Sequence, residues 1–226
     1  LVNPKVNALV NILSEEACEK LTSAECPLGG ALGGMPMAIK DLANVKGFKT
    51  TEGSPLYSER VARKDDQMVA RLRAAGALFI GKTNTPEFGL GSNTFNPVYG
   101  KTKNPYDLTR TCGGSSGGAA VALAARMLSI SDGSDMMGSL RNPAAWNNVY
   151  GLRPTWGLVP PEPSGEIFLS QLSTLGPMAR SPKDLALLLD VQANYFDNKS
   201  YVSQSKSFSN FTAQPRMKGI KIGWLG

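Results

Sequence analysis

The segment that most constrains the fold is a continuous apolar run that starts directly after a glycine-rich loop. Residues 119–130 form this run, and two glycines on each side flank the pair Ser115-Ser116 just before it. The run contains Arg126 and is shorter than the ~20 residues of a bilayer-spanning helix, so it predicts a buried helix in a soluble protein. Because glycine permits positive φ angles and close backbone approach, the loop is expected to be specifically shaped rather than a flexible linker.

Helical and strand-like patterns alternate along the rest of the chain. Apolar residues recur at helical spacing in some segments, and short apolar runs lie between them. This alternation predicts an α/β fold whose sheet is covered by helices on both faces. The expected elements are an amphipathic helix over 6–20, a buried strand over 35–41, a helix from Asp65 or Asp66 to Gly76, a strand over 77–80, a buried helix over 119–128, and a helix that starts with the capping segment 181–184 and continues through Leu189.

The length of 226 residues favours one large domain, because a typical domain has ~150 residues. A polar segment over 196–214 is expected to be a linker. It would separate the main domain, residues 1–195, from the start of a second half at 215–226. We expect a piece of a longer protein, because the chain opens without Met and closes on a strand-like run with nothing after it to pair with.

The absence of histidine narrows the chemistry more than any other feature of the composition. It excludes Ser-His-Asp and Cys-His mechanisms and imidazole zinc sites. The cysteines are odd in number and form no C-x-x-C pair, which favours a reducing, cytoplasmic location. They are Cys18, Cys26 and Cys112. We expect no metal and no cofactor.

The net charge of +6 raises the question of nucleic-acid binding. Basic residues are dispersed and interleaved with acidic ones, as in residues 59–66, rather than gathered into a patch. We therefore expect neither nucleic acid nor a membrane as a partner.

Residues 76–83 match the P-loop pattern G-x-x-x-x-G-K-[ST], and the apolar run that ends at Asp190 could pass for its acidic partner strand. A P-loop needs a phosphate-binding loop between its glycines and a helix from its lysine onward. Here the intervening residues are Ala-Leu-Phe-Ile, which predict a strand, and Pro86 follows closely. Asp190 falls in an expected helix, so a nucleoside triphosphatase is not expected.

Lys40 is the candidate general base. A serine nucleophile needs a proton acceptor, and without histidine the base suited to neutral pH is a lysine whose pKa is lowered by burial. Lys40 ends the apolar run 35–39, where a charged ammonium would be expensive to bury. The alternative is a salt bridge between Lys40 and Asp41.

Five motifs along the chain resemble, in the same order, those of the amidase signature family. The resemblance implies a mixed, mostly buried and twisted sheet with helices on both faces, and residues 1–195 as the N-terminal half of the core. The motifs are GMPMAIKD around Lys40, GKTNTPEF over 81–88, GGSSGG around Ser115, GSDMMGSLRNPA over 133–144, and YGLRPT over 150–155.

The resemblance also implies a Ser-cisSer-Lys triad. Ser139 would be the nucleophile, Ser115 the serine after a cis peptide bond, and Lys40 the base. The implied oxyanion-hole donors are the backbone N–H groups of Met136, Met137, Gly138 and Ser139. The implied supporting residues are Ser116, Asp135 and Arg141.

Two positions depart from the family pattern. Met137 replaces a glycine before the nucleophile, so the turn must accommodate a Cβ atom, and the rim of the site becomes more apolar. Cys112 stands where the family commonly has proline. We interpret Cys112 as a small packed hydrophobic residue rather than a catalytic thiol.

The resemblance implies an enzyme, an amidohydrolase that cleaves the C–N bond of a linear carboxylic acid amide through an acyl-serine. The expected partner is a small-molecule amide, and a homodimer stays open. One alternative is the glutaminase subunit of a tRNA amidotransferase, against which Asn142 argues because that subunit typically carries Arg-Gln-Pro where this chain has residues 141–143. The other is a non-catalytic binding or scaffold protein derived from the family, against which the retention of Lys40, Ser115 and Ser139 argues.

Overall fold

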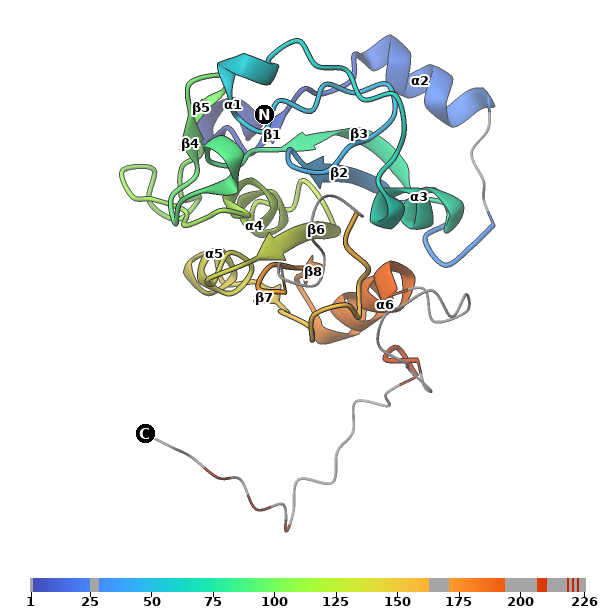
Figure 1. Cartoon of the computed structure of the whole chain (residues 1–226), viewed down its shortest axis with the longest axis vertical. Coiled ribbons are helices and arrows are strands. Elements are labelled where there is room, and N and C mark those ends of the chain that lie inside the picture. The colour runs from blue at the N-terminus through green and yellow to red at the C-terminus, as the bar shows by residue number, and fades with distance from the viewer. Residues whose placement is uncertain are drawn as a thin grey trace.

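The computed structural model of the protein describes residues 2–24, 29–162, 171–193 and 207–210, with residues 219, 221 and 223. Within these residues, helices pack on both sides of two three-stranded sheets, and a two-stranded sheet lies at the edge (Figure 1). The helices are α1 (Asn3–Val6), α2 (Glu15–Ala24), α3 (Gln67–Ala74), α4 (Gly117–Ala124), α5 (Arg141–Trp146) and α6 (Pro182–Ala193), with 3-10 turns at Pro55–Tyr57 and Glu87–Gly89. The strands are β1 (Leu9–Val10), β2 (Pro36–Lys40), β3 (Leu78–Thr83), β4 (Phe95–Asn96), β5 (Gly100–Lys101), β6 (Ile130–Asp135), β7 (Tyr150–Gly151) and β8 (Thr174–Ala179).

The strands are of mixed direction. In the first sheet, β3 lies between β1, which is antiparallel to it, and β2, which is parallel. In the second sheet, β8 pairs antiparallel with both β6 and β7. The predicted mixed α/β fold is confirmed, but its strands form two separate three-stranded sheets instead of one continuous sheet. The edge strands β2 and β6 lie side by side and are joined through side chains, such as Asp132 accepting the Lys40 N–H at 3.0 Å.

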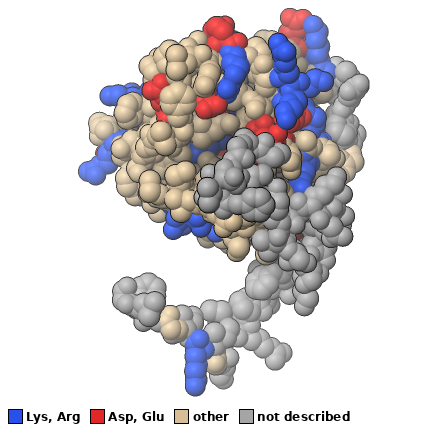
Figure 2. All heavy atoms as spheres, in the orientation of Figure 1, with Lys and Arg blue, Asp and Glu red and all other residues tan. Residues whose placement is uncertain are grey.

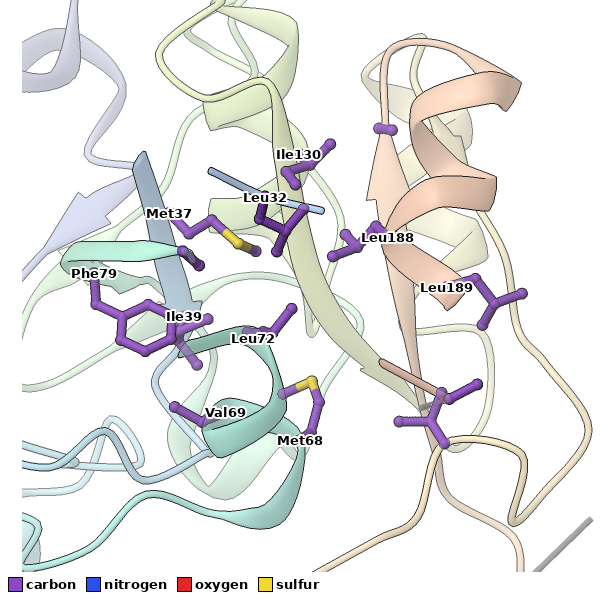
Figure 3. Close-up of a cluster of buried hydrophobic side chains, with 14 of the residues drawn as sticks. Leu32, Met37, Ile39, Met68, Val69, Leu72, Phe79, Ile130, Leu188 and Leu189 are labelled. Atoms are coloured by element: carbon purple, nitrogen blue, oxygen red, sulfur yellow. The ribbon is translucent and has the colours of Figure 1, made fainter. Parts of the chain in front are cut away.

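Each face of the sheet has its own apolar core. On one face, α3 and α6 cover a cluster that includes Met37 and Ile39 of β2 and Phe79 of β3 (Figure 3). On the other face, the buried helix α4 packs against Ala38 of β2. Side chains alternate between the two faces of a strand, so Lys40 belongs to the face that α4 covers.

The start of α4, which contains the last two glycines of the predicted loop, is closely packed. A Cβ atom at Gly118 would lie only 2.3 Å from the backbone nitrogen of Asn84 and 2.7 Å from the carbonyl oxygen of Ala8. Because glycine has no Cβ atom, the start of α4 can closely approach the residues next to β1 and β3. The predicted shaped loop is confirmed, and so is the buried helix, although α4 ends at Ala124 rather than at 128.

The predicted single helix over 6–20 is wrong, because the segment forms α1, β1 and α2. Asn7 ends α1 in the left-handed region, with φ of 53°. Leu9 and Val10 then pair with Thr83 and Lys82 of β3. Pairing and burial along β3 therefore override the helical spacing of the apolar residues.

The other predicted elements are present. The helix after Asp66 and the helix that starts at 182 are α3 and α6, and Ser181 accepts a hydrogen bond from the N–H of Asp184. The P-loop match is confirmed to be a strand, since β3 includes Lys82, whose side chain is fully buried. Asp190 lies in α6, as expected.

Charged side chains are scattered on the face shown in Figure 2, and over its upper part basic and acidic groups lie next to one another. Among the described residues, no helix is both long and apolar enough to cross a bilayer. Most of the predicted linker 196–214, and most of the strand-like run at the end of the chain, lie outside the described residues.

Candidate active site

The side chain of Lys40, at the end of β2, lies among three serine hydroxyls. Its Nζ is 2.7 Å from Ser115 Oγ, 2.9 Å from Ser116 Oγ and 2.9 Å from Ser134 Oγ. Ser115 and Ser116 directly precede α4, which covers the sheet face to which Lys40 belongs. The end of a buried strand and the start of a buried helix therefore meet at this lysine.

Burial governs the protonation of Lys40, which is only 2% exposed. Loss of hydration disfavours the ammonium form and lowers the pKa of Lys40 to about 7, although the charges of Asp132 and Asp135 act in the opposite direction. A lysine of this kind can accept a proton near neutral pH, as the base predicted from the sequence must.

The loop before α4 brings two serines to the lysine from one side. The peptide bond between Gly114 and Ser115 is cis, and Ser115 is 2% exposed. The N–H of Ser116 donates a hydrogen bond to the carbonyl oxygen of Ser139 at 3.2 Å. This contact ties the serine loop to the turn that follows β6, so the structure brings Ser139 to the same site.

Asp135, the last residue of β6, organises the turn that carries Ser139. Its carboxylate accepts hydrogen bonds from the N–H groups of Gly138 at 2.8 Å and Leu140 at 3.1 Å, and from Arg141 Nε at 3.0 Å. Burial alone would raise the pKa of Asp135, but these hydrogen bonds, with that of Arg141 foremost, lower it to about 2. Asp135 therefore stays ionised, and it holds the turn and Arg141 together.

One of these contacts involves a backbone N–H group that was predicted to be an oxyanion donor. The Gly138 N–H is committed to Asp135. Among the described residues, none accepts a hydrogen bond from the N–H of Met136, Met137 or Ser139. The four-donor oxyanion hole stays a prediction, and in this structure the Gly138 N–H is held by Asp135.

Gly138 also explains how the chain tolerates Met137. The turn needs one positive φ angle, and Gly138 supplies it with 113°. Met137 is not in the left-handed region, and its side chain is 80% exposed. Met136 is 44% exposed, so two methionines form an apolar rim beside the half-buried Ser139.

Cys112 is confirmed as a packed residue. Its side chain is fully buried in the cluster around α4. Burial raises the pKa of Cys112 to about 12, so the thiol stays protonated at neutral pH and is not a nucleophile.

Two polar residues of β6 were not predicted. Ser134 Oγ lies 2.9 Å from Lys40 Nζ, and Asp132 Oδ1 accepts the backbone N–H of Lys40. They are two residues apart, so they share one face of the strand. Polar residues alternating at 132 and 134 in a strand are the signal that could have identified them.

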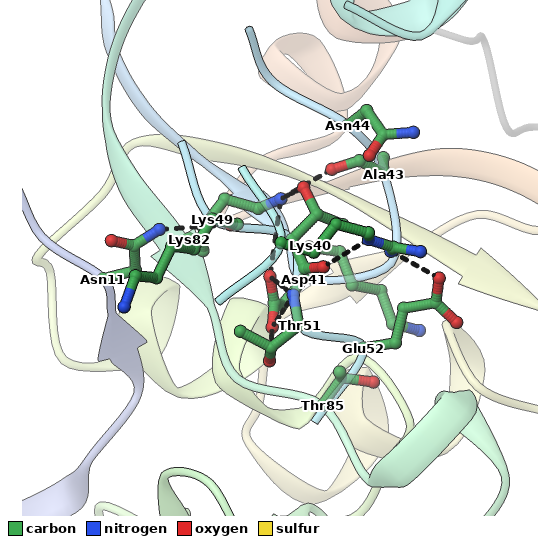
Figure 4. Close-up of polar contacts among 12 residues, drawn as sticks. Asn11, Lys40, Asp41, Ala43, Asn44, Lys49, Thr51, Glu52, Lys82 and Thr85 are labelled. Atoms are coloured by element: carbon green, nitrogen blue, oxygen red, sulfur yellow. Dashed lines mark hydrogen bonds and ion pairs between the residues drawn. The ribbon is translucent and has the colours of Figure 1, made fainter. Parts of the chain in front are cut away.

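The alternative partner of Lys40, Asp41, is engaged elsewhere (Figure 4). Asp41 Oδ1 lies 3.5 Å from Lys82 Nζ, and Asp41 Oδ2 accepts a hydrogen bond from Thr51 Oγ1 at 2.5 Å. Lys82 also donates to the carbonyl oxygen of Ala43 at 2.6 Å. The expected alternative, a salt bridge between Lys40 and Asp41, is therefore wrong.

A cavity of about 250 Å³ lies beside Lys40. Lys40, Asp132 and Ser134 contribute to its polar wall, and Met68 and Trp156 contribute to its apolar wall. A small molecule could therefore approach the base from this side.

The arrangement has the parts of a serine acyl-transfer site. They are a lysine with a near-neutral pKa, a buried hydroxyl in contact with it, and a second serine on a turn whose N–H groups are available to an oxygen atom. Within the described residues, no cluster of three Cys, Asp or Glu side chains could hold a metal ion.

Fold and site together define an α/β chain with a buried lysine among serine hydroxyls, and comparison with known proteins identifies the family. The chain belongs to the amidase signature family, because the family model described as Amidase matches residues 1–225.

Particular relatives extend this finding. The chain is 40% identical to a glutamyl-tRNA(Gln) amidotransferase subunit of Coxiella burnetii, over 98% of this chain and 47% of that protein. Among solved structures, it is similar to 6-aminohexanoate cyclic dimer hydrolase complexed with substrate, with a TM-score of 0.81 and 34% identity over 92% of this chain and 44% of that one. It is also similar to the corresponding glutamyl-tRNA(Gln) amidotransferase subunit of Thermotoga maritima, with a TM-score of 0.79 and 32% identity over 91% and 44% of the two chains. The chain thus spans about half the length of the relatives it matches.

Proposed function

We propose that this chain supplies the catalytic centre of an amidohydrolase that cleaves the C–N bond of a linear carboxylic acid amide through an acyl-serine intermediate. Ser139 is the nucleophile, Ser115 transfers its proton, and Lys40 is the base. The observation that carries the proposal is the 2.7 Å contact between the buried Lys40 Nζ and Ser115 Oγ.

Acylation begins when Lys40, in its neutral form, takes the proton of Ser115 as Ser115 takes that of Ser139. The Ser139 oxygen attacks the amide carbonyl carbon, and the negative charge develops on the carbonyl oxygen. The N–H groups of Met136, Met137 and Ser139, which have no acceptor among the described residues, donate to this oxygen. The proton then passes to the leaving nitrogen, the C–N bond breaks, and the amine departs.

Deacylation reverses the proton path with water as the nucleophile. Water loses a proton towards Ser115 and Lys40 and attacks the acyl carbon, and Ser139 leaves with a proton returned to its oxygen. Ser139 Oγ forms no hydrogen bond with Ser115 in this structure, and such catalytic contacts often tighten only when substrate binds. A small-molecule amide is the proposed substrate, and the cysteine content supports a cytoplasmic location.

A fluorophosphonate probe tests the proposal, because it reacts with activated serines. We expect mass spectrometry to find the label on Ser139. A Ser139→Ala variant should keep its fold and lose both label and turnover, whereas Ser92→Ala, on an exposed loop, should retain both. Label on Ser115, Ser116 or Cys112 would contradict the assignment, and no label on any serine would favour a non-catalytic protein.

A second candidate is a glutaminase-type subunit that supplies ammonia to a tRNA amidotransferase. The observation that favours it is the 40% identity, across nearly the whole chain, to relatives named as glutamyl-tRNA(Gln) amidotransferase subunits. Against it stands only the single position Asn142.

Substrate assays separate the two candidates. A simple amidase should hydrolyse small amides at the same rate with or without other proteins. A glutaminase-type subunit should prefer glutamine, and its turnover should rise when partner proteins and glutamylated tRNA are added.

A further inference from the structure

A buried carboxylate, that of Asp132, lies next to the main chain of the proposed base. Asp132 is 1% exposed and stands on β6, the strand that runs beside β2. Its Oδ1 accepts a hydrogen bond from the backbone N–H of Lys40 at 3.0 Å, across the boundary between the two three-stranded sheets. The Asp132 side chain thus accepts the backbone N–H that a carbonyl oxygen of a neighbouring strand would accept inside a sheet.

We propose that Asp132 is a positioning residue for Lys40, which fixes the main chain of the base and supplies the negative charge that balances its ammonium form. The proposal rests on the assignment of Lys40 as the base. It extends that assignment to a residue that touches neither Ser115 nor Ser139 in any hydrogen bond of the structure.

Several charged groups face Lys40, and Asp132 is distinct among them. Asp135 is already neutralised by Arg141 Nε at 3.0 Å, and Arg153 Nε lies 3.4 Å from it. Asp41 is paired with Lys82. The remaining acidic groups that line the cavity beside Lys40 have hydrogen bonds of their own, and they are Asp66 and Glu162.

The protonation behaviour of the two groups agrees with this role. Burial raises the pKa of Asp132 to about 6, against the opposing hydrogen bond from the Lys40 N–H and the charges of Lys40 and Lys82. Burial lowers the pKa of Lys40 to about 7. The pKa values of these two buried groups are close, so the groups titrate as a coupled pair. The charge of Asp132 therefore affects the pH at which Lys40 becomes neutral.

The test is the Asp132→Asn variant, followed by the rate of fluorophosphonate labelling of Ser139 as a function of pH. Asparagine keeps an oxygen that can accept the Lys40 N–H but removes the charge. Without that charge, the ammonium form of Lys40 is less stable, so the acid limb of the profile should move to lower pH by roughly one unit or more. Asp190→Asn, a change at another buried aspartate, should leave the limb in place.

The outcomes separate the inference from the proposed function. If the wild-type protein is labelled at Ser139 and the Asp132→Asn limb stays or moves to higher pH, the inference is wrong and the proposed function stands. If the wild-type protein is not labelled at Ser139, the proposed function fails first. Should the variant not fold, carbon-13 NMR of the wild-type carboxyl groups replaces it. Asp132 should then titrate in the pH range of the labelling profile, and an ordinary midpoint near pH 4 would overturn the inference.

Discussion

Lys40 and Lys82 are both buried, stand on the paired strands β2 and β3, and differ in what surrounds their ammonium groups. Lys82 lies opposite Ile39 in the strand pairing, so it belongs to the sheet face opposite that of Lys40. It contacts the Asp41 carboxylate and the Ala43 carbonyl oxygen, and it also donates to the Thr50 hydroxyl at 3.3 Å.

Lys40 contacts only serine hydroxyls, with carboxylates at a greater distance. A hydroxyl can give up a proton as well as accept a hydrogen bond, whereas a carbonyl oxygen and an ionised carboxylate can only accept. Burial lowers the pKa of both lysines. The comparison therefore indicates that the close carboxylate and carbonyl oxygen, rather than burial, distinguish the structural cation Lys82 from the candidate base Lys40.

The largest expected effect comes from making Lys40 permanently charged. Lys40→Arg should reduce amide turnover by on the order of 10³-fold or more, because arginine cannot accept a proton at any working pH. Steady-state kinetics with circular dichroism as the control for folding measures this. Residual activity within tenfold of the wild type would remove Lys40 from the role of base.

The corresponding change at Lys82 should damage stability instead of chemistry. Lys82→Met leaves the buried Asp41 carboxylate without its cation and should lower the free energy of unfolding by about 3–5 kcal/mol. Urea unfolding measures the loss. Adding Asp41→Asn should recover part of it, and the folded fraction should still label at Ser139. A stable variant that cannot be labelled would break the comparison.

The pH profile of the wild-type protein should follow Lys40. With a pKa of about 7, the neutral form falls tenfold for each pH unit below that value, so kcat/KM at pH 5 should be roughly 100-fold below its plateau. Activity should stay high on the alkaline side, where the base remains neutral. A profile that declines from pH 7 to pH 9 would contradict a lysine base.

The smallest effect is expected at Ser134, the third hydroxyl around Lys40. Ser134→Ala removes one hydrogen bond to Nζ while Ser115 and Ser116 remain, and should reduce kcat/KM by roughly two- to tenfold. Ser58→Ala, which removes a hydrogen bond from a half-buried serine to the carbonyl oxygen of Pro55, is the matched control. A loss as large as that of Lys40→Arg would make Ser134 part of the catalytic relay.

The sequence predicted what depends on local pattern. The helix α3 with its start after Asp66, the strand β3, and the shaped loop before the buried helix α4 all follow from periodicity, capping and glycine content. Lys40 was identified because a lysine after an apolar run implies burial. The groups that contact Lys40 from the neighbouring strand β6 depend on how distant segments pack, so Asp132 and Ser134 were not predicted.

The failures share one physical reason, which is pairing between distant segments. Leu9 and Val10 have helical spacing with Val6, yet they become a strand because β3 offers them partners. Asp41 adjoins Lys40 in sequence, but neighbours in a strand point to opposite faces, and Asp41 finds Lys82 instead.

The boundary between the two three-stranded sheets, where β2 faces β6, affects how the chain folds. The contact that closes it joins residues 92 apart in sequence, so it forms only after a long loop has closed. Closing it also buries Lys40, whose pKa falls from 10.5 to about 7, so at pH 8 to 9 assembly of the fold releases close to one proton from this side chain. Between pH 7 and 10.5 the unfolded chain holds that proton more tightly than the folded one. The contribution of Lys40 to stability therefore rises with pH across this window, and mildly alkaline conditions favour the assembled fold and the reactive form of the site together.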